Sequence, residues 1–285
     1  MRGLIGVLLA MFSSYAMSQA FETTAQKKRT DPANSNTTQK TGSKQEKINF
    51  PAQLPPPSDT TLKLIAALQN NNLEIAELLL QSGGDINCKN CSNYVVGAVM
   101  TVPTNGLQPN KRLVWMVEHG ADINAQADDG RTPIMFALDR GLNVFWSHVP
   151  DVTYFMKKDA DVKLKDKLGK NALHHFAEHY KPSPPQSTLA DAELIRRENI
   201  FYAGTFQNLM VNGIDINDVD LQGNTASHYA ARNCNELSVD LFIKAGSDLR
   251  KQNLRNETSL DIAIDTAIRN PSPSCNKVVT ILKSS

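Results

Sequence analysis

Apolar residues recur at helical spacing along much of the chain, and the helical stretches end at glycine-containing turns. From Leu73 to Leu80, apolar residues follow the three- and four-residue intervals that place side chains on one face of a helix. Gly83 and Gly84 follow closely, where glycine commonly stands just past a helix end. The pattern predicts short helices joined by turns.

The turn after Leu80 has close copies further along the chain, which indicates an internal repeat. It reads Gly83-Gly84-Asp85-Ile86-Asn87, and the related turns are Gly120-Ala121-Asp122-Ile123-Asn124, Asp159-Ala160-Asp161-Val162, Gly213-Ile214-Asp215-Ile216-Asn217 and Gly246-Ser247-Asp248-Leu249. Five such turns predict five copies of one unit, with a sixth, shortened copy from Asn253 to the C-terminus. The most regular copy runs from Asp220 to Leu249, and the 33 residues from Thr225 to Thr258 give the period.

A second motif opens these units. It reads Gly130-Arg131-Thr132-Pro133-Ile134-Met135-Phe136-Ala137 in one copy and Gly223-Asn224-Thr225-Ala226-Ser227-His228-Tyr229-Ala230 in another, and Gly169 to Ala177 is related. Together with the turn, this motif resembles the ankyrin repeat, in which a glycine turn and T-P-L-H-x-A open the first of two helices. The resemblance covers about residues 61–282.

The resemblance implies an all-α ankyrin-repeat solenoid of about six helix-turn-helix units over residues 60–285. Thr132 and Thr225 are then expected to cap first helices, and His174 and His228 to tie the turn of one repeat to the next. A single unit cannot bury both of its faces. Stability is therefore expected to come from the interfaces between neighbouring repeats, with the first and last units acting as caps.

The spacing between units departs from the period in two places. There are 39 residues from Thr132 to Asn171, and 54 from Asn171 to Thr225. The second surplus, 21 residues, falls at about Lys181–Ile200 and includes a charged helical stretch. Insertions in repeat proteins map to loops and often to a binding surface, and a passive insertion is the alternative.

The first 20 residues have the organisation of a secretory signal peptide. Arg2 precedes an apolar run from Leu4 to Phe12, and small residues lead to a predicted cleavage site after Ala20. A membrane anchor is the alternative, but the run is about half of the roughly 20 residues that a transmembrane helix needs. The mature protein is therefore expected in a bacterial periplasm or outside the cell, without a membrane span. Residues 21–59, rich in Thr, Gln, Lys, Asn, Ser and Pro, are expected to form a disordered linker.

The composition indicates neither a nucleic-acid partner nor a cofactor. The formal net charge is only +1, whereas nucleic-acid-binding proteins typically carry a strong basic excess. The sequence contains no glycine-rich phosphate loop, nucleophile elbow or catalytic triad pattern. We therefore expect no cofactor and no enzymatic activity.

Four cysteines in an exported protein are expected to form disulfides. Cys88 and Cys91 could form a redox pair, half of a zinc site or a small loop disulfide. The disulfide is favoured, because no second cysteine pair supplies zinc ligands and no βαβ pattern surrounds the motif. Cys234 and Cys275 fall in equivalent loops of adjacent repeats, so we expect them to form a bridge that holds the C-terminal cap.

One short motif carries metal ligands. His175, Glu178 and His179 follow the H-x-x-E-H order of a class of zinc peptidases, with the two histidines four residues apart on one helix face. The stretch lies within the first helix of a repeat, and the sequence identifies no distal acidic ligand. A metal-dependent hydrolase is therefore only a remote alternative, and no metal site is predicted.

The function that the resemblance implies is protein binding, because repeat solenoids present an extended surface of hairpin tips and first helices. The positions expected on that surface are Asp128, Asp129, Arg131, Lys167, Lys170, Leu221, Gln222 and Asn224. The partner is an unidentified protein, in the periplasm or, if the chain is a secreted effector, in a host cell. Replacing Arg131 and Lys170 with Glu is expected to weaken binding without lowering the melting temperature.

Overall fold

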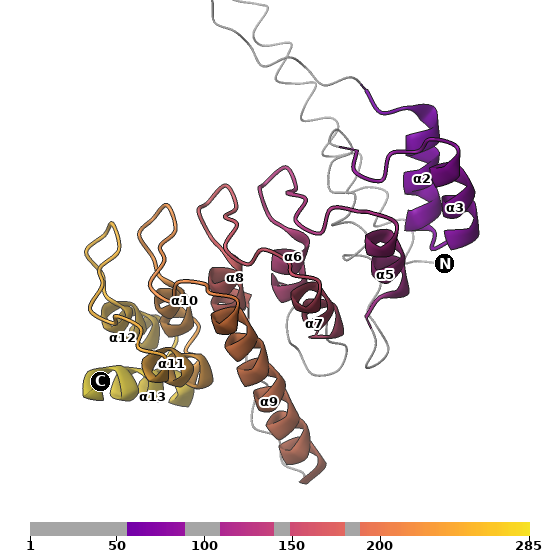
Figure 1. Cartoon of the computed structure of the whole chain (residues 1–285). Helices are drawn as coiled ribbons and strands as arrows, with labels where there is room; N and C mark the ends of the chain where they lie inside the picture. The colour runs from indigo at the N-terminus through magenta and orange to yellow at the C-terminus, as the bar shows by residue number, and fades with distance from the viewer. Residues whose placement is uncertain (1–55, 89–108, 140–148, 180–188) are drawn as a thin grey trace, which may run out of the picture. The chain divides into compact units, whose positions relative to one another are not determined.

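The computed structural model describes residues 56–88, 109–139, 149–179 and 189–285, apart from the side chains of residues 149–150 and of most of 189–198. Within these ranges it contains eleven helices and no strand (Figure 1). The described ranges belong to one compact unit, Gln53–Ser285. The predicted signal peptide and nearly all of the predicted linker lie outside the described residues.

The helices follow one another in pairs, as the repeat pattern predicts. The pairs are α2 (Asp59–Gln69) with α3 (Leu73–Gln81), α6 (Pro133–Asp139) with α7 (Val149–Lys157), α8 (Ala172–His179) with α9 (Leu189–Val211), α10 (Ala226–Arg232) with α11 (Glu236–Lys244), and α12 (Ser259–Arg269) with α13 (Pro273–Ser284). The helix α5 (Lys111–Glu118) belongs to the second unit, which is described only in part. First helices α6, α8, α10 and α12 contact one another in order, and so do second helices α7, α9, α11 and α13 (Figure 1). The predicted all-α stack of about six units is confirmed.

The recurring turns close the second helices in one common way. At the end of α11, Gly246 has a left-handed backbone with φ +79°, and the N–H of Ser247 donates to the carbonyl of Phe242 at 3.0 Å. The equivalent bonds after α3, α5 and α7 run from Gly84 to Leu79, from Ala121 to Met116 and from Ala160 to Phe155. Each of these bonds satisfies a carbonyl that the helix leaves without a partner, which explains why the turn recurs along the chain.

The motif that opens each repeat begins a helix, because a side chain in the first turn accepts a backbone N–H at the helix start. In α10, the backbone N–H of Thr225 donates to Nδ1 of His228, three residues later, at 3.1 Å. The same bond recurs from Asn171 to His174 Nδ1 in α8, from Thr258 to Asp261 Oδ2 in α12 and from Thr132 to Met135 Sδ in α6. The acceptor residue changes between repeats, but its position in the helix does not.

The core lies between neighbouring helix pairs. One cluster of buried apolar residues extends from Leu113 in α5 to Leu282 in α13. A second cluster joins α2, α3 and α5 around Leu64 and Met116. Both clusters draw residues from several units, in agreement with the expectation that each repeat buries its surface against its neighbours.

The 21 extra residues between Asn171 and Thr225 lengthen a helix where the structure describes them. The helix α9 spans 23 residues, whereas α7 and α11 span nine each. Residues Leu189–Ile200 form the first half of α9, so the charged helical stretch expected in the insertion is part of this helix. No proline interrupts the stretch from Leu189 to Val211, so the backbone hydrogen bonds continue through it. Residues 181–188 of the predicted insertion lie outside the described residues.

Candidate functional site

The tips of four successive hairpins form a row joined by backbone hydrogen bonds. The tips comprise residues 127–132, 166–171, 220–225 and 253–258. The N–H groups of Lys167, Leu221 and Leu254 donate to the carbonyls of Asp129, Leu168 and Gln222, respectively, each at 2.9 Å. Every bond joins the second position of one tip to the third position of the tip before it. The tips therefore hold one fixed spacing.

Polar side chains inside the tips maintain this geometry. One carboxylate oxygen of Asp166 accepts the N–H groups of Leu168 and Lys170 at 2.8 Å each, and Asp220 has the same role in the next tip. Gly169 has φ +78°, and a Cβ there would lie 2.8 Å from the backbone nitrogen of Leu221. Glycine at this position thus allows both the turn and the close approach of the next tip.

The predicted binding residues fall into exposed and buried groups. Those exposed to solvent are Asp128, Asp129, Lys167, Leu221 and Gln222. Arg131 is partly exposed, whereas Lys170 and Asn224 are buried. The amide of Asn224 donates to Asp220 and accepts from Asn253, so this side chain supports the tips from within.

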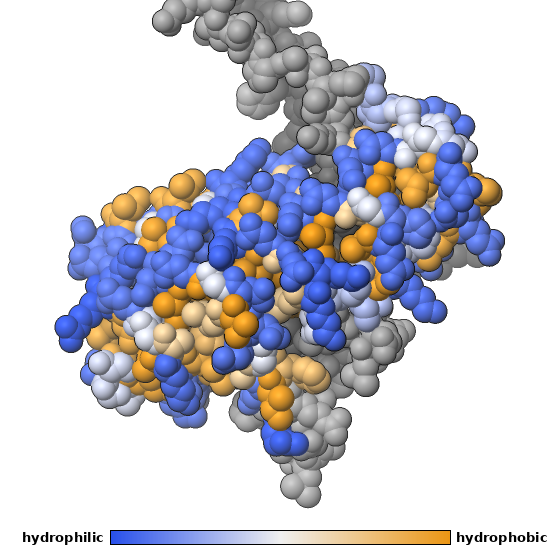
Figure 2. All heavy atoms as spheres, viewed as in Figure 1, coloured by the Kyte–Doolittle hydropathy of each residue, from blue (hydrophilic) through white to orange (hydrophobic). Residues whose placement is uncertain are grey.

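Two exposed leucines that the sequence interpretation did not single out lie in the same row. Leu168 is 57% exposed and Leu254 77% exposed, beside Leu221 at 70%. Figure 2 shows apolar surface among polar surface where Figure 1 places the hairpins that lead to α10 and α12. An alignment of the turn motifs could have identified both residues, because they occupy the second and third tip positions.

Ion pairs join the tips to the ends of the first helices α6 and α8. Arg131 Nη1 lies 2.7 Å from Asp139 Oδ2, and Lys170 Nζ lies 2.7 Å from Glu178 Oε2. The two pairs are equivalent, since each joins residues eight positions apart in its own repeat. Both cations are therefore held within the chain. Their replacement by Glu is expected to lower the melting temperature, which corrects the expectation drawn from the sequence.

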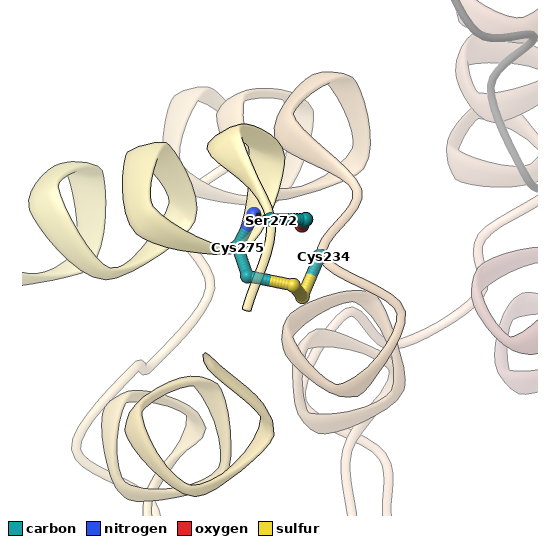
Figure 3. The surroundings of a disulfide bond; sticks show 3 residues. All are labelled: Cys234, Ser272 and Cys275. Carbon is teal, nitrogen blue, oxygen red and sulfur yellow. Dashed lines mark hydrogen bonds between the residues drawn. A yellow bond between two sulfur atoms is a disulfide. The ribbon is translucent and has the colours of Figure 1, made fainter. Parts of the chain in front are cut away.

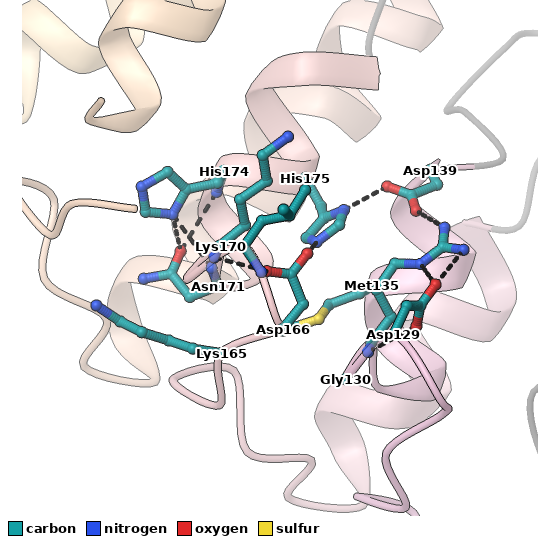
Figure 4. A network of polar contacts seen from close by, with 12 residues as sticks. Asp129, Gly130, Met135, Asp139, Lys165, Asp166, Lys170, Asn171, His174 and His175 are labelled. Carbon is teal, nitrogen blue, oxygen red and sulfur yellow. Dashed lines mark hydrogen bonds and ion pairs between the residues drawn. The ribbon is translucent and has the colours of Figure 1, made fainter. Parts of the chain in front are cut away.

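His175 lies buried between two carboxylates (Figure 4). Its Nδ1 is 2.6 Å from Asp139 Oδ1, and its Nε2 is 3.2 Å from Asp166 Oδ2. Burial alone would lower the pKa of His175, but the hydrogen bonds to both carboxylates raise it overall. Burial alone would raise the pKa of Asp139, but the hydrogen bond with His175 and the nearby positive charges hold it below its usual value.

Helix pairs, glycine turns and aligned hairpin tips are the geometry of one repeat family. The sequence model of the ankyrin repeat matches residues 64–91, which include most of α2, all of α3 and the turn that follows. The chain contains an ankyrin repeat there and has the fold of an ankyrin-repeat solenoid. Ankyrin repeats are protein–protein interaction modules, and proteins built from them are typically binding scaffolds. Within the described part of this ankyrin chain, no helix has the length and apolar character needed to cross a membrane.

Two histidines of the ankyrin motif tie neighbouring repeats together, as predicted. His174 Nε2 donates to the carbonyl of Asn224, and His228 Nε2 donates to the carbonyl of Glu257, both at 3.1 Å. Because a carbonyl oxygen only accepts, Nε2 carries the proton in each ring and Nδ1 is left as an acceptor. Burial lowers the pKa of His174 to about 4 and also lowers that of His228. Both rings are therefore neutral at pH 7.

The two histidines of the H-x-x-E-H motif face a carboxylate from outside the motif. The ligand atoms of His175, His179 and Asp139 lie within 4.8 Å of one another. Glu178 Oε2 is 2.7 Å from Lys170 Nζ and 3.5 Å from His179 Nε2; burial would raise the pKa of Glu178, but hydrogen bonds from His179 and Lys170 lower it to about 2. Asp139 is the acidic neighbour that the sequence does not reveal, because it precedes His175 by 36 residues and lies in another repeat.

Cys234 and Cys275 form the predicted disulfide, with Cα atoms 4.5 Å apart (Figure 3). Cys275 lies in the first turn of α13 and not in the loop before it, which corrects its predicted position. The helix begins there because the hydroxyl of Ser272 accepts the N–H of Cys275 at 3.1 Å. Cys88 is disulfide-bonded as well, and Cys91 lies outside the described residues.

Proposed function

We propose that this ankyrin-repeat protein is exported and that it binds a partner protein along its hairpin tips. The signal-peptide pattern of residues 1–20 supports export, and the hydrogen-bonded row of tips supports binding. In this proposal the partner contacts Leu168 and Leu254 together with Asp128, Asp129, Lys167, Leu221 and Gln222.

The observation that carries the proposal is the set of exposed leucines on adjacent tips. Leu168, Leu221 and Leu254 are each more than half exposed, and backbone hydrogen bonds link their hairpins in order. Burial of one leucine side chain contributes about 1.5–3 kcal/mol, so three adjacent exposed leucines form a surface that a partner can cover favourably. Grouped apolar side chains at a surface mark interaction sites more often than single ones.

The tip row also limits the entropic cost of binding. The carboxylates of Asp166 and Asp220 fix the two tips that carry Leu168 and Leu221, and the bonds between tips fix their spacing. A surface that is ordered before the partner arrives loses little conformational freedom on association. Asp128, Asp129 and Lys167 add charges at the other end of the row, and such rim charges act mainly on partner choice.

The test compares two sets of apolar-to-serine substitutions. In the first, Leu168, Leu221 and Leu254 are each replaced with Ser. In the matched control, Val211 and Ile268 are replaced with Ser, because they are similarly exposed but lie at the ends of α9 and α12. A partner is first identified by affinity capture from the native compartment, and its dissociation constant is then measured with both purified proteins.

The triple variant is expected to weaken the complex by at least about a hundredfold, which corresponds to roughly 2.8 kcal/mol, while the control binds like the wild type. Equal affinity of all three proteins would remove the tips from the interface. Export is tested separately by sequencing the N-terminus of the mature protein, which is expected to begin at Phe21. Recovery from host cytoplasm instead of a periplasmic fraction would favour the effector role.

A further inference from the structure

The polar network between α6 and α8 contains two imidazoles and a carboxylate that face one another. Asp139 Oδ1 lies 2.6 Å from His175 Nδ1 and 3.2 Å from His179 Nε2. The two histidines are four residues apart on α8, and their rings are nearly parallel, with an angle of 11° between the planes. Histidines at this spacing share one helix face and can bind one metal ion together.

The ligand atoms of the three residues all lie within 4.8 Å of one another, and two of their separations can be compared with those of a metal site. In a tetrahedral zinc site with bonds of about 2.0–2.1 Å, neighbouring ligand atoms lie about 3.3 Å apart. The contact between His179 and Asp139 already has this length, whereas the contact between His175 and Asp139 is shorter by about 0.7 Å.

The groups around the three ligands orient them as in protein metal sites. Asp166 Oδ2 lies 3.2 Å from Nε2 of His175, which leaves Nδ1 as the ligand atom directed at the cluster. A carboxylate bound to the second nitrogen of a ligating histidine is the usual arrangement around protein-bound zinc. Arg131 binds Oδ2 of Asp139 at 2.7 Å, so the other oxygen, Oδ1, faces the histidines.

The charges of the network leave room for a divalent cation. The carboxylates of Asp129, Asp139 and Asp166 carry three negative charges, and the guanidinium of Arg131 carries one positive charge. When both imidazoles are neutral, as metal ligands must be, these four groups have a net charge of −2. Glu178 does not alter this net charge, because Lys170 pairs with it. His179 is 39% exposed at its side chain, which gives an ion a route from solvent to the buried ligands.

We propose that Asp139, His175 and His179 form a binding site for a divalent transition-metal ion, with zinc as the reference ion. Two imidazoles and one carboxylate suit zinc and its neighbours in the first transition row, and exclude calcium and magnesium as preferred ions. Asp166 positions His175 in this site without contacting the ion. A fourth coordination position stays open to water beside the exposed edge of His179.

The first experiment titrates the purified full mature chain, without a histidine tag and stripped by a chelator, with Zn²⁺ in a calorimeter. Cys88, Cys234 and Cys275 are disulfide-bonded and offer no competing thiolate. One ion is expected to bind per chain and to raise the melting temperature. Co²⁺ in place of Zn²⁺ is expected to give a visible ligand-field band.

Two substitutions test the assignment of residues. His179→Gln is expected to weaken Zn²⁺ binding by at least about a hundredfold and to abolish the cobalt band, and Asp166→Asn to weaken binding by about 10- to 100-fold. His119→Gln is the control, because His119 caps the C-terminal end of α5 beside Glu77 and lies outside the cluster. Circular dichroism and melting curves without metal verify that each variant is folded.

The proposal is overturned if the wild type binds no ion saturably, or if folded His179→Gln retains wild-type affinity. A loss of affinity in His119→Gln that equals the loss in His179→Gln would also overturn it, because binding would then not depend on the cluster. These outcomes are independent of the leucine row, since none of the three leucines belongs to the metal site.

Discussion

The ring of His174 links two repeats, because its Nε2 donates to the carbonyl of Asn224, fifty residues later, at 3.1 Å. Its Nδ1 accepts the N–H of Asn171 and so caps its own helix. His228 repeats both interactions one unit further on. In α6 the same helix position is occupied by Met135, whose sulfur accepts the capping N–H at 3.4 Å but has no proton to donate.

Met135→His is therefore expected to stabilise the protein. The new ring can accept from the N–H of Thr132 and from its hydroxyl, which is a buried group without a partner, and Nε2 can donate to the next tip. Each hydrogen bond contributes about 1 kcal/mol, and loss of the apolar thioether offsets part of the gain. The free energy of unfolding in urea is expected to rise by about 1 kcal/mol.

The matched control for this substitution is Met135→Leu, which keeps the apolar volume and removes the sulfur acceptor. It is expected to leave the stability within about 1.5 kcal/mol of the wild type and not above it. A decrease for Met135→His of the same size as for Met135→Leu would show that the histidine makes neither interaction.

The neutral ring of His228 is expected to make stability depend on pH. Burial lowers its pKa in the folded chain; the hydrogen bond to the Glu257 carbonyl raises it, and the charge of Arg232 lowers it. The unfolded residue titrates near pH 6.5, so between that pH and the lower folded pKa only the unfolded state gains a proton. The contribution of neutral His228 to the free energy of unfolding is therefore complete above about pH 6.5 and declines as the pH falls below it.

The measurement compares urea unfolding of the wild type and His228→Gln at about pH 7.5 and about pH 5.5. The variant is less stable at both values because it loses the cap, but its loss of stability on acidification is expected to be smaller. An equal pH dependence in both proteins would mean that His228 does not stay neutral in the folded chain.

Lys170→Glu is expected to destabilise the protein strongly. Lys170 Nζ lies 2.7 Å from Glu178 and 4.6 Å from the ring centroid of Tyr229, and the side chain is mostly buried. The substitution places two carboxylates together where little water reaches them, at a cost of about 3 kcal/mol. Lys167→Glu is the control: it changes the charge equally on an exposed tip, and should alter stability by no more than about 0.5 kcal/mol.

Removal of the disulfide between Cys234 and Cys275 is expected to loosen the C-terminal cap. The cysteines are separated by 41 residues, and a loop of this size corresponds to about 4 kcal/mol in the chain-entropy model. With both cysteines replaced by Ser, amide exchange is expected to accelerate first in α12 and α13, because each end unit has a neighbour on one side only. Exchange that accelerates equally in α6 and α8 would contradict a local role of the bridge.

The elements of this fold could be predicted because their signals are local. The helix at Leu73–Gln81, the turn at Gly246 and the cap at Thr225 each depend on residues within one helical turn of one another. The bridge between Cys234 and Cys275 was also predictable, because the repeat period places one unit against the next.

The internal contacts of the polar tip residues could not be predicted in the same way. Arg131 and Lys170 stand in turn motifs that are usually exposed, yet each reaches a carboxylate on its own first helix. Asn224 also belongs to a tip, but neighbouring amides and carboxylates enclose it. Long polar side chains have several rotamers open to them, and only the contacts of the folded chain select one.

The sequence by itself determined the repeat, its period, the helix starts and ends, and the candidate export signal, because these follow from short-range hydrogen bonding and from composition. Only the tertiary structure decided that His175 lies between Asp139 and Asp166, and that leucines from three hairpins lie in one row. Asp139 comes from another repeat than His175 and Asp166, and the three leucines come from three repeats. Their proximity arises from the stacking of whole units, which no local pattern of residues specifies.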